Sequence, residues 1–318
     1  MSHFLSLFHF TAAITFPIFL IVFLGWWFKR IGWLSEGFIE SGSKLVFNLG
    51  LPALLFIKII ESDLSHVLDL KQLCYAILST ILAFIVLWWL SGRMRLRPEN
   101  RGVFVQGAFR GNMGIIGLAL CAAMYGDAGL AVGSILLAFL TLLYNILSVY
   151  ALSAAHRQAG QSHWRTVLLG LAKNPLIITI LAGISVNLMQ VSIPSVLLKS
   201  GGYLADLTLP LALLCIGGSI NARALQSSGV LALQASTLKL VVLPFLMTLG
   251  AYLFGMQGLL LGTLFLMFAS PAATVGFIMA KAMRGNAELA ATIITLSTVC
   301  SLFTISLGVF VLKAIGLV

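Results

Sequence analysis

Ten apolar stretches, each about 20 residues long, follow one another along the chain with short polar joints between them. About 20 apolar residues are what a helix needs to cross the hydrocarbon core of a bilayer. Only 9% of the residues are charged, against about 25% in a soluble globular domain. The stretches lie near residues 9–29, 37–59, 71–92, 98–125, 127–152, 165–188, 196–220, 229–254, 258–281 and 286–313. The sequence therefore predicts an all-α polytopic membrane protein with ten transmembrane helices.

Basic residues are concentrated in every second joint, which predicts the orientation of the chain. Lys and Arg outnumber Asp and Glu by 19 to 9, and cytoplasmic joints carry such an excess. The joints after the first, third, fifth, seventh and ninth stretches hold Lys29, Arg30, Arg93, Arg95, Arg97, Arg101, Arg157, Arg165, Arg223, Lys281 and Arg284. The opposite side has only Lys58, Lys71, Lys199 and Lys313. Both termini are thus expected outside the cell membrane, the inner membrane in a bacterium, and no nucleic-acid partner is needed to explain the charge.

The second half of the chain resembles the first. YGDAGLAVGSILLAFLTLLYNI (125–146) aligns with RGNAELAATIITLSTVCSLFTI (284–305) at an offset of 159 residues (284 − 125 = 159). At nearly the same offset, LGLPALL (49–55) resembles LTLPLALL (207–214). Short apolar strings can also match by chance, but these matches keep one spacing and one order.

This repeat predicts how the chain is divided. Each half would hold five crossings, and because five is odd the second half enters the membrane from the opposite side. We expect a first five-helix repeat at residues 1–155, a cytoplasmic joint at 156–164 and a second, inverted repeat at 165–318. Inverted repeats of this kind are common in secondary transporters.

Two of the apolar stretches contain residues that oppose a continuous helix. GAFRGNMGIIG lies within 98–125, and ASPAATVG lies within its counterpart 258–281. Gly destabilises a helix interior by about 1 kcal/mol and Pro by about 3 kcal/mol. Irregular backbone at membrane depth is tolerated only where protein or a water-filled cavity surrounds it. The sequence thus predicts that helices 4 and 9 are broken and cross near the midplane, although close packing of small residues would explain the glycines alone.

Broken helices expose free backbone N–H groups that attract anions, so we place a substrate site at the crossing. The expected substrate-binding residues are Arg110, Gly111, Asn112, Gly114, Ser270, Pro271, Thr274, Asn48 and Asn145. The guanidinium of Arg110 could attract a carboxylate or pair with backbone carbonyls. Asn48 and Asn145 could equally join helices to one another. Asp206 and Lys239, each inside an apolar stretch, are expected to form a charge pair or to couple transport to an ion.

Six strings together resemble the auxin efflux carrier family, including its bacterial members. They are NLGLPALLF, GNMGIIGL, KNPLIITILAG, LPLALLCIGGS, SPAATVGFIMAKA and ELAATIITLSTVCSLFTI, and they cover nearly the whole chain. The resemblance implies ten helices in two inverted repeats, with helices 4 and 9 crossing where they break. It implies organic-anion substrates: indole-3-acetate in plants, and dicarboxylates such as malonate or malate in bacteria. The family pattern has a GLPL-like string where this chain reads GLAL, with Ala119 in place of proline.

These features favour a secondary transporter that moves a small organic anion by alternating access. The chain has no P-loop and no nucleophile–base or metal motif that would indicate an ATPase or an enzyme. An anion channel or a membrane sensor is the alternative. Proton, sodium or membrane-potential coupling are all open. No cofactor is expected, and the expected partners are the anion and the lipid bilayer, with a homodimer also compatible with the sequence.

Overall fold

The computed structural model describes residues 2–61, 69–155, 175–220 and 229–318. In these four ranges the chain forms helices, and no strand is present beyond a single isolated β-bridge. The predicted all-α class is therefore confirmed. The predicted cytoplasmic joint at 156–164 and the beginning of the apolar stretch 165–188 lie outside the described residues.

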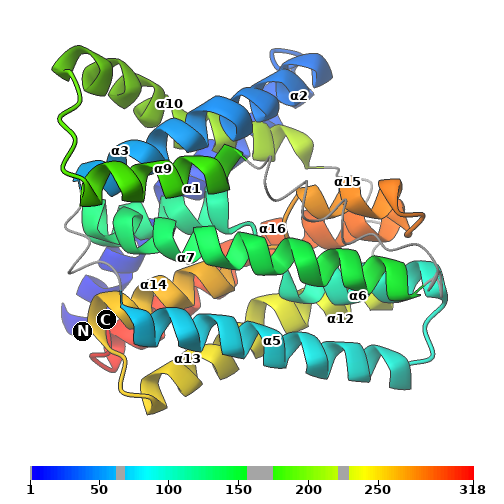
Figure 1. The fold of residues 1–318 in the computed structure, drawn as a ribbon. Coiled ribbons are helices and arrows are strands. Elements are labelled where there is room, and N and C mark those ends of the chain that lie inside the picture. Colours follow the sequence, from blue (N-terminus) through cyan, green and yellow to red (C-terminus); the bar gives the residue numbers. More distant parts are fainter. Residues whose placement is uncertain (1, 62–68, 156–174, 221–228) are drawn as a thin grey trace.

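A first group of helices forms one side of the molecule (Figure 1). Within it α1 packs on α10, and α3 packs on both α9 and α10. Gly25 and Gly217 allow α1 and α10 to approach closely, because a Cβ atom at either position would collide with the backbone of the other helix. The members of this group are α1 (Ser2–Arg30), α2 (Glu36–Leu45), the π-helical turn η1 (Val46–Gly50), α3 (Leu51–Glu61), α9 (Pro175–Leu188) and α10 (Ser195–Ser219).

A second group contains the remaining described helices. In it α6 packs on α7 and α5, α14 packs on α7 and α13, and α16 packs on α12 and α15. Its members are α5 (Leu70–Arg93), α6 (Pro98–Phe109), η2 (Met113–Gly117), α7 (Leu118–Ala155), α12 (Val230–Thr237), η3 (Leu238–Val242), α13 (Leu243–Leu253), α14 (Gly258–Ala269), α15 (Val275–Ala282) and α16 (Ala287–Ala314).

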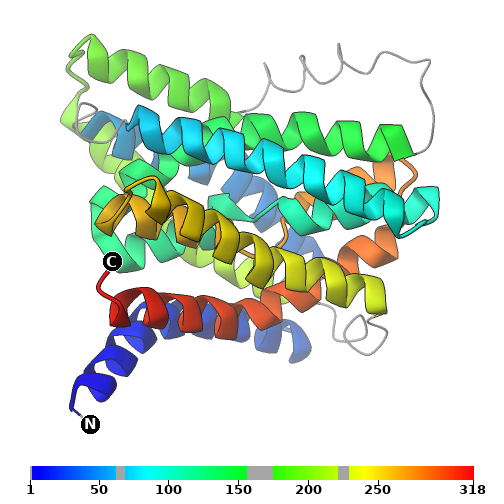
Figure 2. The same cartoon turned by 90° about the horizontal axis from the view of Figure 1, so that it is seen from below.

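The two groups meet along a limited set of helices. Figure 2 shows α16 beside α1, and these two helices are in contact. Further contacts join α7 to α1, α3 and α9, and join α10 to η2. The second group therefore lies against the first through α7, α16 and η2.

Seven helices of the described ranges are long and apolar enough to cross a membrane. They are Leu5–Arg30, Glu36–Glu61, Leu70–Arg93, Met113–Ala155, Ser195–Ser219, Val230–Leu253 and Ala287–Ala314. Two further apolar helices, α9 and α14, are shorter. The described residues thus include the helices that a multi-pass protein requires.

The longest of these helices turns back on itself at Gly126. Gly126 has φ 59° and ψ −141°, which is not helical. A Cβ atom at Gly133 would lie 3.1 Å from the side chain of Leu118. In a straight helix these two residues would be about 22 Å apart along the axis. The chain therefore reverses at Gly126, and the two parts of α7 pack against one another.

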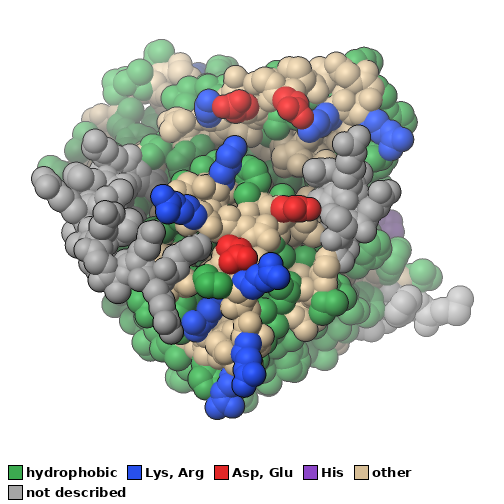
Figure 3. Space-filling model, turned by 90° about the vertical axis from the view of Figure 1, so that its right-hand side faces the viewer, with side chains coloured by type: hydrophobic (Ala, Val, Ile, Leu, Met, Phe, Trp, Pro, Cys, Tyr) green, Lys and Arg blue, Asp and Glu red, His purple; other side chains and the backbone are tan. Residues whose placement is uncertain are grey.

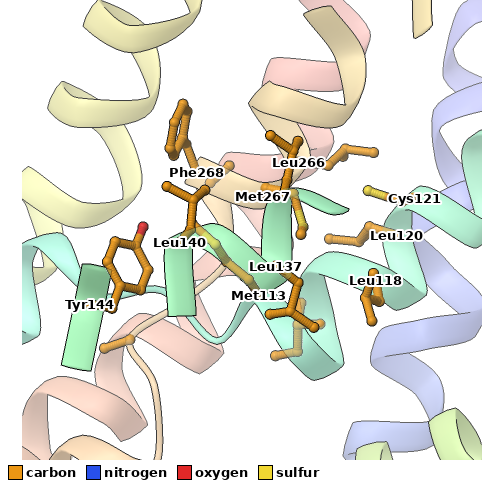
Figure 4. Packing of buried hydrophobic residues seen from close by; sticks show 14 of the residues in the cluster. Met113, Leu118, Leu120, Cys121, Leu137, Leu140, Tyr144, Leu266, Met267 and Phe268 are labelled. Atoms are coloured by element: carbon orange, nitrogen blue, oxygen red, sulfur yellow. The ribbon is translucent and has the colours of Figure 1, made fainter. Parts of the chain in front are cut away.

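Buried apolar side chains of η2, α7 and α14 pack together in the second group. Figure 4 shows Met113 of η2, Leu137 and Leu140 of α7, and Met267 and Phe268 of α14 lying together. These side chains are all buried. They hold η2 and the end of α14 against α7, which fixes the position of the segments described next.

The basic residues gather at one end of the helices. Figure 3 looks onto the right-hand end of Figure 1, where several Lys and Arg side chains lie on the surface with Asp and Glu side chains among them. Arg93 ends α5, Arg97 precedes α6 and Lys281 lies in the last turn of α15. Both chain termini lie at the opposite end (Figure 1).

Candidate functional site

Two helical interruptions in the second group lie against each other. Helix α6 ends at Phe109 and η2 begins at Met113, while α14 ends at Ala269 and α15 begins at Val275. The intervening segments pair in an antiparallel bridge between Gly111 and Ala272. We call this pair of segments, residues 110–112 and 270–274, the crossover.

Backbone hydrogen bonds join the two segments of the crossover. The N–H of Asn112 donates to the carbonyl of Pro271 at 2.7 Å, and the N–H of Ala273 donates to the carbonyl of Arg110 at 3.1 Å. Backbone groups freed by the interruptions thus pair with each other, as buried backbone requires inside a membrane. Pro271, which has no N–H of its own, takes part through its carbonyl.

Gly111 is the residue that lets the two segments meet. A Cβ atom at this position would lie 2.5 Å from Ser270 Oγ and 3.0 Å from Lys239 Nζ. Side chains larger than hydrogen therefore do not fit here without displacing a neighbour. Gly114, one turn further on, has ordinary contacts instead, the nearest being Leu137 at 3.6 Å and Leu51 of α3 at 3.8 Å.

Arg110 is buried beside the crossover and is held by side chains of α7. It is 6% exposed. Its Nη2 donates to Asn145 Oδ1 at 2.8 Å and its Nη1 to Ser148 Oγ at 3.2 Å. The sulfur of Met279 in α15 also lies 3.2 Å from Nη1. The structure therefore brings together Arg110 and Asn145, two of the expected site residues, and adds Ser148.

The polar groups of the Asn112 and Thr274 side chains form no hydrogen bond with other described residues. Asn112 is 8% exposed, and no described residue hydrogen-bonds to its amide or to the hydroxyl of Thr274. Ser270 differs, because its hydroxyl donates to the Met267 carbonyl at 2.7 Å and so closes the end of α14. Asn112 and Thr274 are thus the polar side chains of the crossover that could receive a ligand.

Two expected site residues lie away from the crossover. Asn48 in η1 is exposed, and its amide donates to the Lys44 carbonyl at 2.9 Å within the same helix. Asp206 is exposed on α10 in the first group. The described residues contain no ion pair between Asp206 and Lys239, so the expected charge pair is not formed here. The two residues belong to different helix groups, Asp206 to the first and Lys239 to the second.

Lys239 has a different environment from the one that we expected. It lies in η3, is 2% exposed, and its Nζ donates to the carbonyl of Phe268 at 2.7 Å. Phe268 is in the last turn of α14, directly before the crossover. The ammonium group therefore lies at the crossover, next to Gly111.

The crossover brings together two buried basic side chains and no buried carboxylate. Arg110 and Lys239 are both buried, whereas none of the acidic residues in the described ranges is buried. Those ranges also contain no group of three or more His, Cys, Asp and Glu side chains that could hold a metal ion. The electrostatics of the site thus suit an anion.

The described cavity beside Arg110 is small. The cavity beside Arg110 has a volume of about 10 Å³ and is lined by residues that include Gln106, Ala272 and Gly276. This is about the volume that one water molecule requires. A ligand larger than one water molecule would not fit this cavity as it stands.

Known proteins resemble the chain over most of its length, and residues 11–309 match the membrane transport protein family. An uncharacterised transporter of Methanocaldococcus jannaschii is 25% identical over 311 residues, or 93% of this chain and 96% of the relative. One of Methanothermobacter thermautotrophicus is 25% identical over 300 residues, with shares of 93% and 96%. The uncharacterised transporter YfdV of Escherichia coli is 23% identical over 290 residues, with shares of 87% and 91%. The chain is therefore a multi-pass membrane transporter rather than an enzyme, and it belongs to the membrane transport protein family, as its resemblance to the auxin efflux carriers predicted.

Proposed function

We propose that the protein is a secondary transporter that carries a small organic anion and binds it at the crossover. The observation that carries this proposal is the buried guanidinium of Arg110, whose described partners are all uncharged, in a region where no described acidic residue is buried. A buried charge is strongly unfavourable unless it is paired. A substrate carboxylate would supply the missing negative charge.

The free polar groups of the crossover support a carboxylate ligand. The amide of Asn112 can donate to a carboxylate oxygen, and the hydroxyl of Thr274 can do the same. Arg110, held in place by Asn145 and Ser148, provides positive charge nearby without having to reorganise. The proposed substrates are mono- or dicarboxylates, malonate-like, malate-like or auxin-like.

Matching segment lengths support an inverted repeat of ten crossings. The segments Leu70–Arg93 and Val230–Leu253 are both 24 residues long, and α6 and α14 are both 12 residues long. Each pair is separated by the same 160 positions (230 − 70 and 258 − 98). Both termini lie at one end of the molecule (Figure 1), as an even number of crossings requires. In this proposal the basic end of Figure 3 faces the cytoplasm.

The division into two helix groups supports alternating access. The second group contains the whole crossover, and it touches the first group through α7, α16 and η2. Movement of one group against the other would open the crossover to one side of the membrane at a time. The small cavity beside Arg110, about 10 Å³ in volume, would have to widen during such a movement.

The transported charge itself can drive the carrier. One elementary charge that crosses 100 mV gains about 2.3 kcal/mol, which is equivalent to roughly a 50-fold concentration ratio. We therefore propose membrane potential as the driving force. Proton coupling through Asp206 and sodium coupling are the alternatives, and imposing pH, sodium and voltage gradients one at a time distinguishes them.

Uptake of labelled malonate, malate and indole-3-acetate into proteoliposomes tests the proposal. We expect saturable uptake of at least one of these anions by the wild-type protein. Asn112→Ala removes the free amide at the crossover and should reduce the uptake rate by ~10-fold or more, because a lost hydrogen bond to a charged group is worth about 1.5–3 kcal/mol.

Asn48→Ala is the matched comparison, since it makes the same change at an exposed position away from the crossover. We expect it to transport at close to the wild-type rate. Equal, saturable uptake by the Asn112→Ala variant and the wild-type protein would remove Asn112 from the site. Non-saturating flux with single-channel currents would instead identify an anion channel.

A further inference from the structure

Lys239 is a buried cation whose described hydrogen-bond partner is a main-chain carbonyl. Its Nζ donates to the Phe268 carbonyl at 2.7 Å, and the side chain is only 2% exposed. No ion pair joins it to an acidic residue of the described ranges. An ordinary salt bridge therefore does not explain why a lysine is buried here.

The carbonyl that Lys239 contacts belongs to a helix end. Phe268 is the penultimate residue of α14, which ends at Ala269. The last carbonyls of a helix have no partner within the helix and carry partial negative charge. In carriers with discontinuous helices, such half-helix ends are where a coupling cation is held.

Lys239 lies in the π-helical turn η3 between α12 and α13, and such turns occur frequently at functional sites. The Nζ and Cε atoms would lie 3.0 Å and 3.4 Å from a Cβ atom at Gly111. The ammonium thus lies between the end of α14 and Gly111 of the crossover.

We propose that the ammonium of Lys239 is a tethered cation that occupies the place of a coupling ion at the end of α14. This inference rests on the proposed carrier function, because a coupling-ion position has meaning only in a carrier. The sequence leaves open whether transport is coupled to sodium. If Lys239 fills the cation position, transport would not require sodium. Removing the lysine should create a site that a small free cation can fill.

Two substitutions distinguish a cation site from a packing effect. Lys239→Ala removes the charge and leaves space, whereas Lys239→Met removes the charge but fills most of the space. Melting temperatures of the purified proteins would be measured without substrate, at constant ionic strength, in sodium, methylammonium or choline chloride. Choline is the control cation because it is too large for the vacated space.

We expect both variants to melt below the wild-type protein in choline. Sodium or methylammonium should then raise the melting temperature of Lys239→Ala saturably, by ~3 °C or more. Neither cation should shift the Lys239→Met variant. If Lys239→Ala shows no preference for small cations over choline, the inference is wrong.

The wild-type protein gives a second test that does not depend on whether the variants fold. Its melting temperature and its uptake should be the same in sodium and in choline. A saturable stabilisation of the wild-type protein by sodium would overturn the inference, since the position would then not be filled by Lys239.

The outcomes also separate this inference from the proposed function. Sodium-independent organic-anion uptake by the wild-type protein, without any cation response of Lys239→Ala, would retain the carrier and reject the tethered cation. A cation response without uptake of any tested anion would retain the tethered cation and reject the proposed substrate class.

Discussion

Replacing Gly111 by alanine should disrupt the crossover through steric overlap. The added methyl group would lie 2.5 Å from Ser270 Oγ and 3.0 Å from Lys239 Nζ. The Lys239 tip can move, but Ser270 Oγ is buried and donates to the Met267 carbonyl at 2.7 Å. The two interrupted segments would therefore have to separate.

The expected loss of stability can be worked out from these contacts. Inserting a methyl group into a well-packed site is destabilising by about 1–3 kcal/mol. If the two backbone hydrogen bonds of the crossover also lengthen, each contributes about 0.5–1.5 kcal/mol more. The smaller backbone entropy of the unfolded alanine variant offsets at most about 1 kcal/mol. With both hydrogen bonds lengthened, the net destabilisation is roughly 1–6 kcal/mol by these estimates.

Gly114→Ala is the matched control because it makes the same change in the same segment. There the nearest atoms would be 3.6–3.8 Å from the new Cβ, which is ordinary contact, so its stability should be unchanged or higher by up to about 1 kcal/mol. Thermal unfolding of both variants in detergent gives the comparison. Adding Ser270→Ala to Gly111→Ala should restore part of the loss. If the Gly111→Ala variant melts at the same temperature as the wild-type protein, Gly111 does not lie as close to Ser270 and Lys239 as the structure shows.

Two further variants test individual side chains. Arg110→Lys keeps the positive charge, but one ammonium cannot replace the two guanidinium nitrogens that donate to Asn145 and Ser148. The initial uptake rate should therefore fall by ~10-fold. An unchanged rate would show that these two hydrogen bonds are not needed for transport. Asp206→Asn should leave the melting temperature unchanged, because Asp206 is exposed and forms no described ion pair with Lys239, and a clear decrease would contradict the structure at that position.

The composition and the order of the motifs were sufficient to predict the class of protein. Lipid accepts only backbone that is internally hydrogen-bonded, so long apolar stretches with few charges leave little choice but membrane helices. The order of six weak motifs was also sufficient for the family, as the match over residues 11–309 confirms. These properties depend on patterns along the chain and need no tertiary contacts.

The partners of individual polar side chains could not be predicted in the same way. Asp206 and Lys239 lie at similar depths in their stretches, which suggested a pair, but depth says nothing about which helix group a residue joins. Lys239 instead contacts a carbonyl, and every residue has one, so the sequence carries no signal for it. Ser148 is different: it lies three residues after Asn145 and therefore on the same helix face, which could have identified it as a second partner of Arg110.

A structure determined with a transported anion bound would test the central claim most directly. The account predicts density for a carboxylate at the crossover, with an oxygen about 2.7–3.2 Å from the amide nitrogen of Asn112 and the two helix groups moved apart on one side. Anion density at another place, with residues 110–112 and 270–274 still closed upon each other, would contradict it.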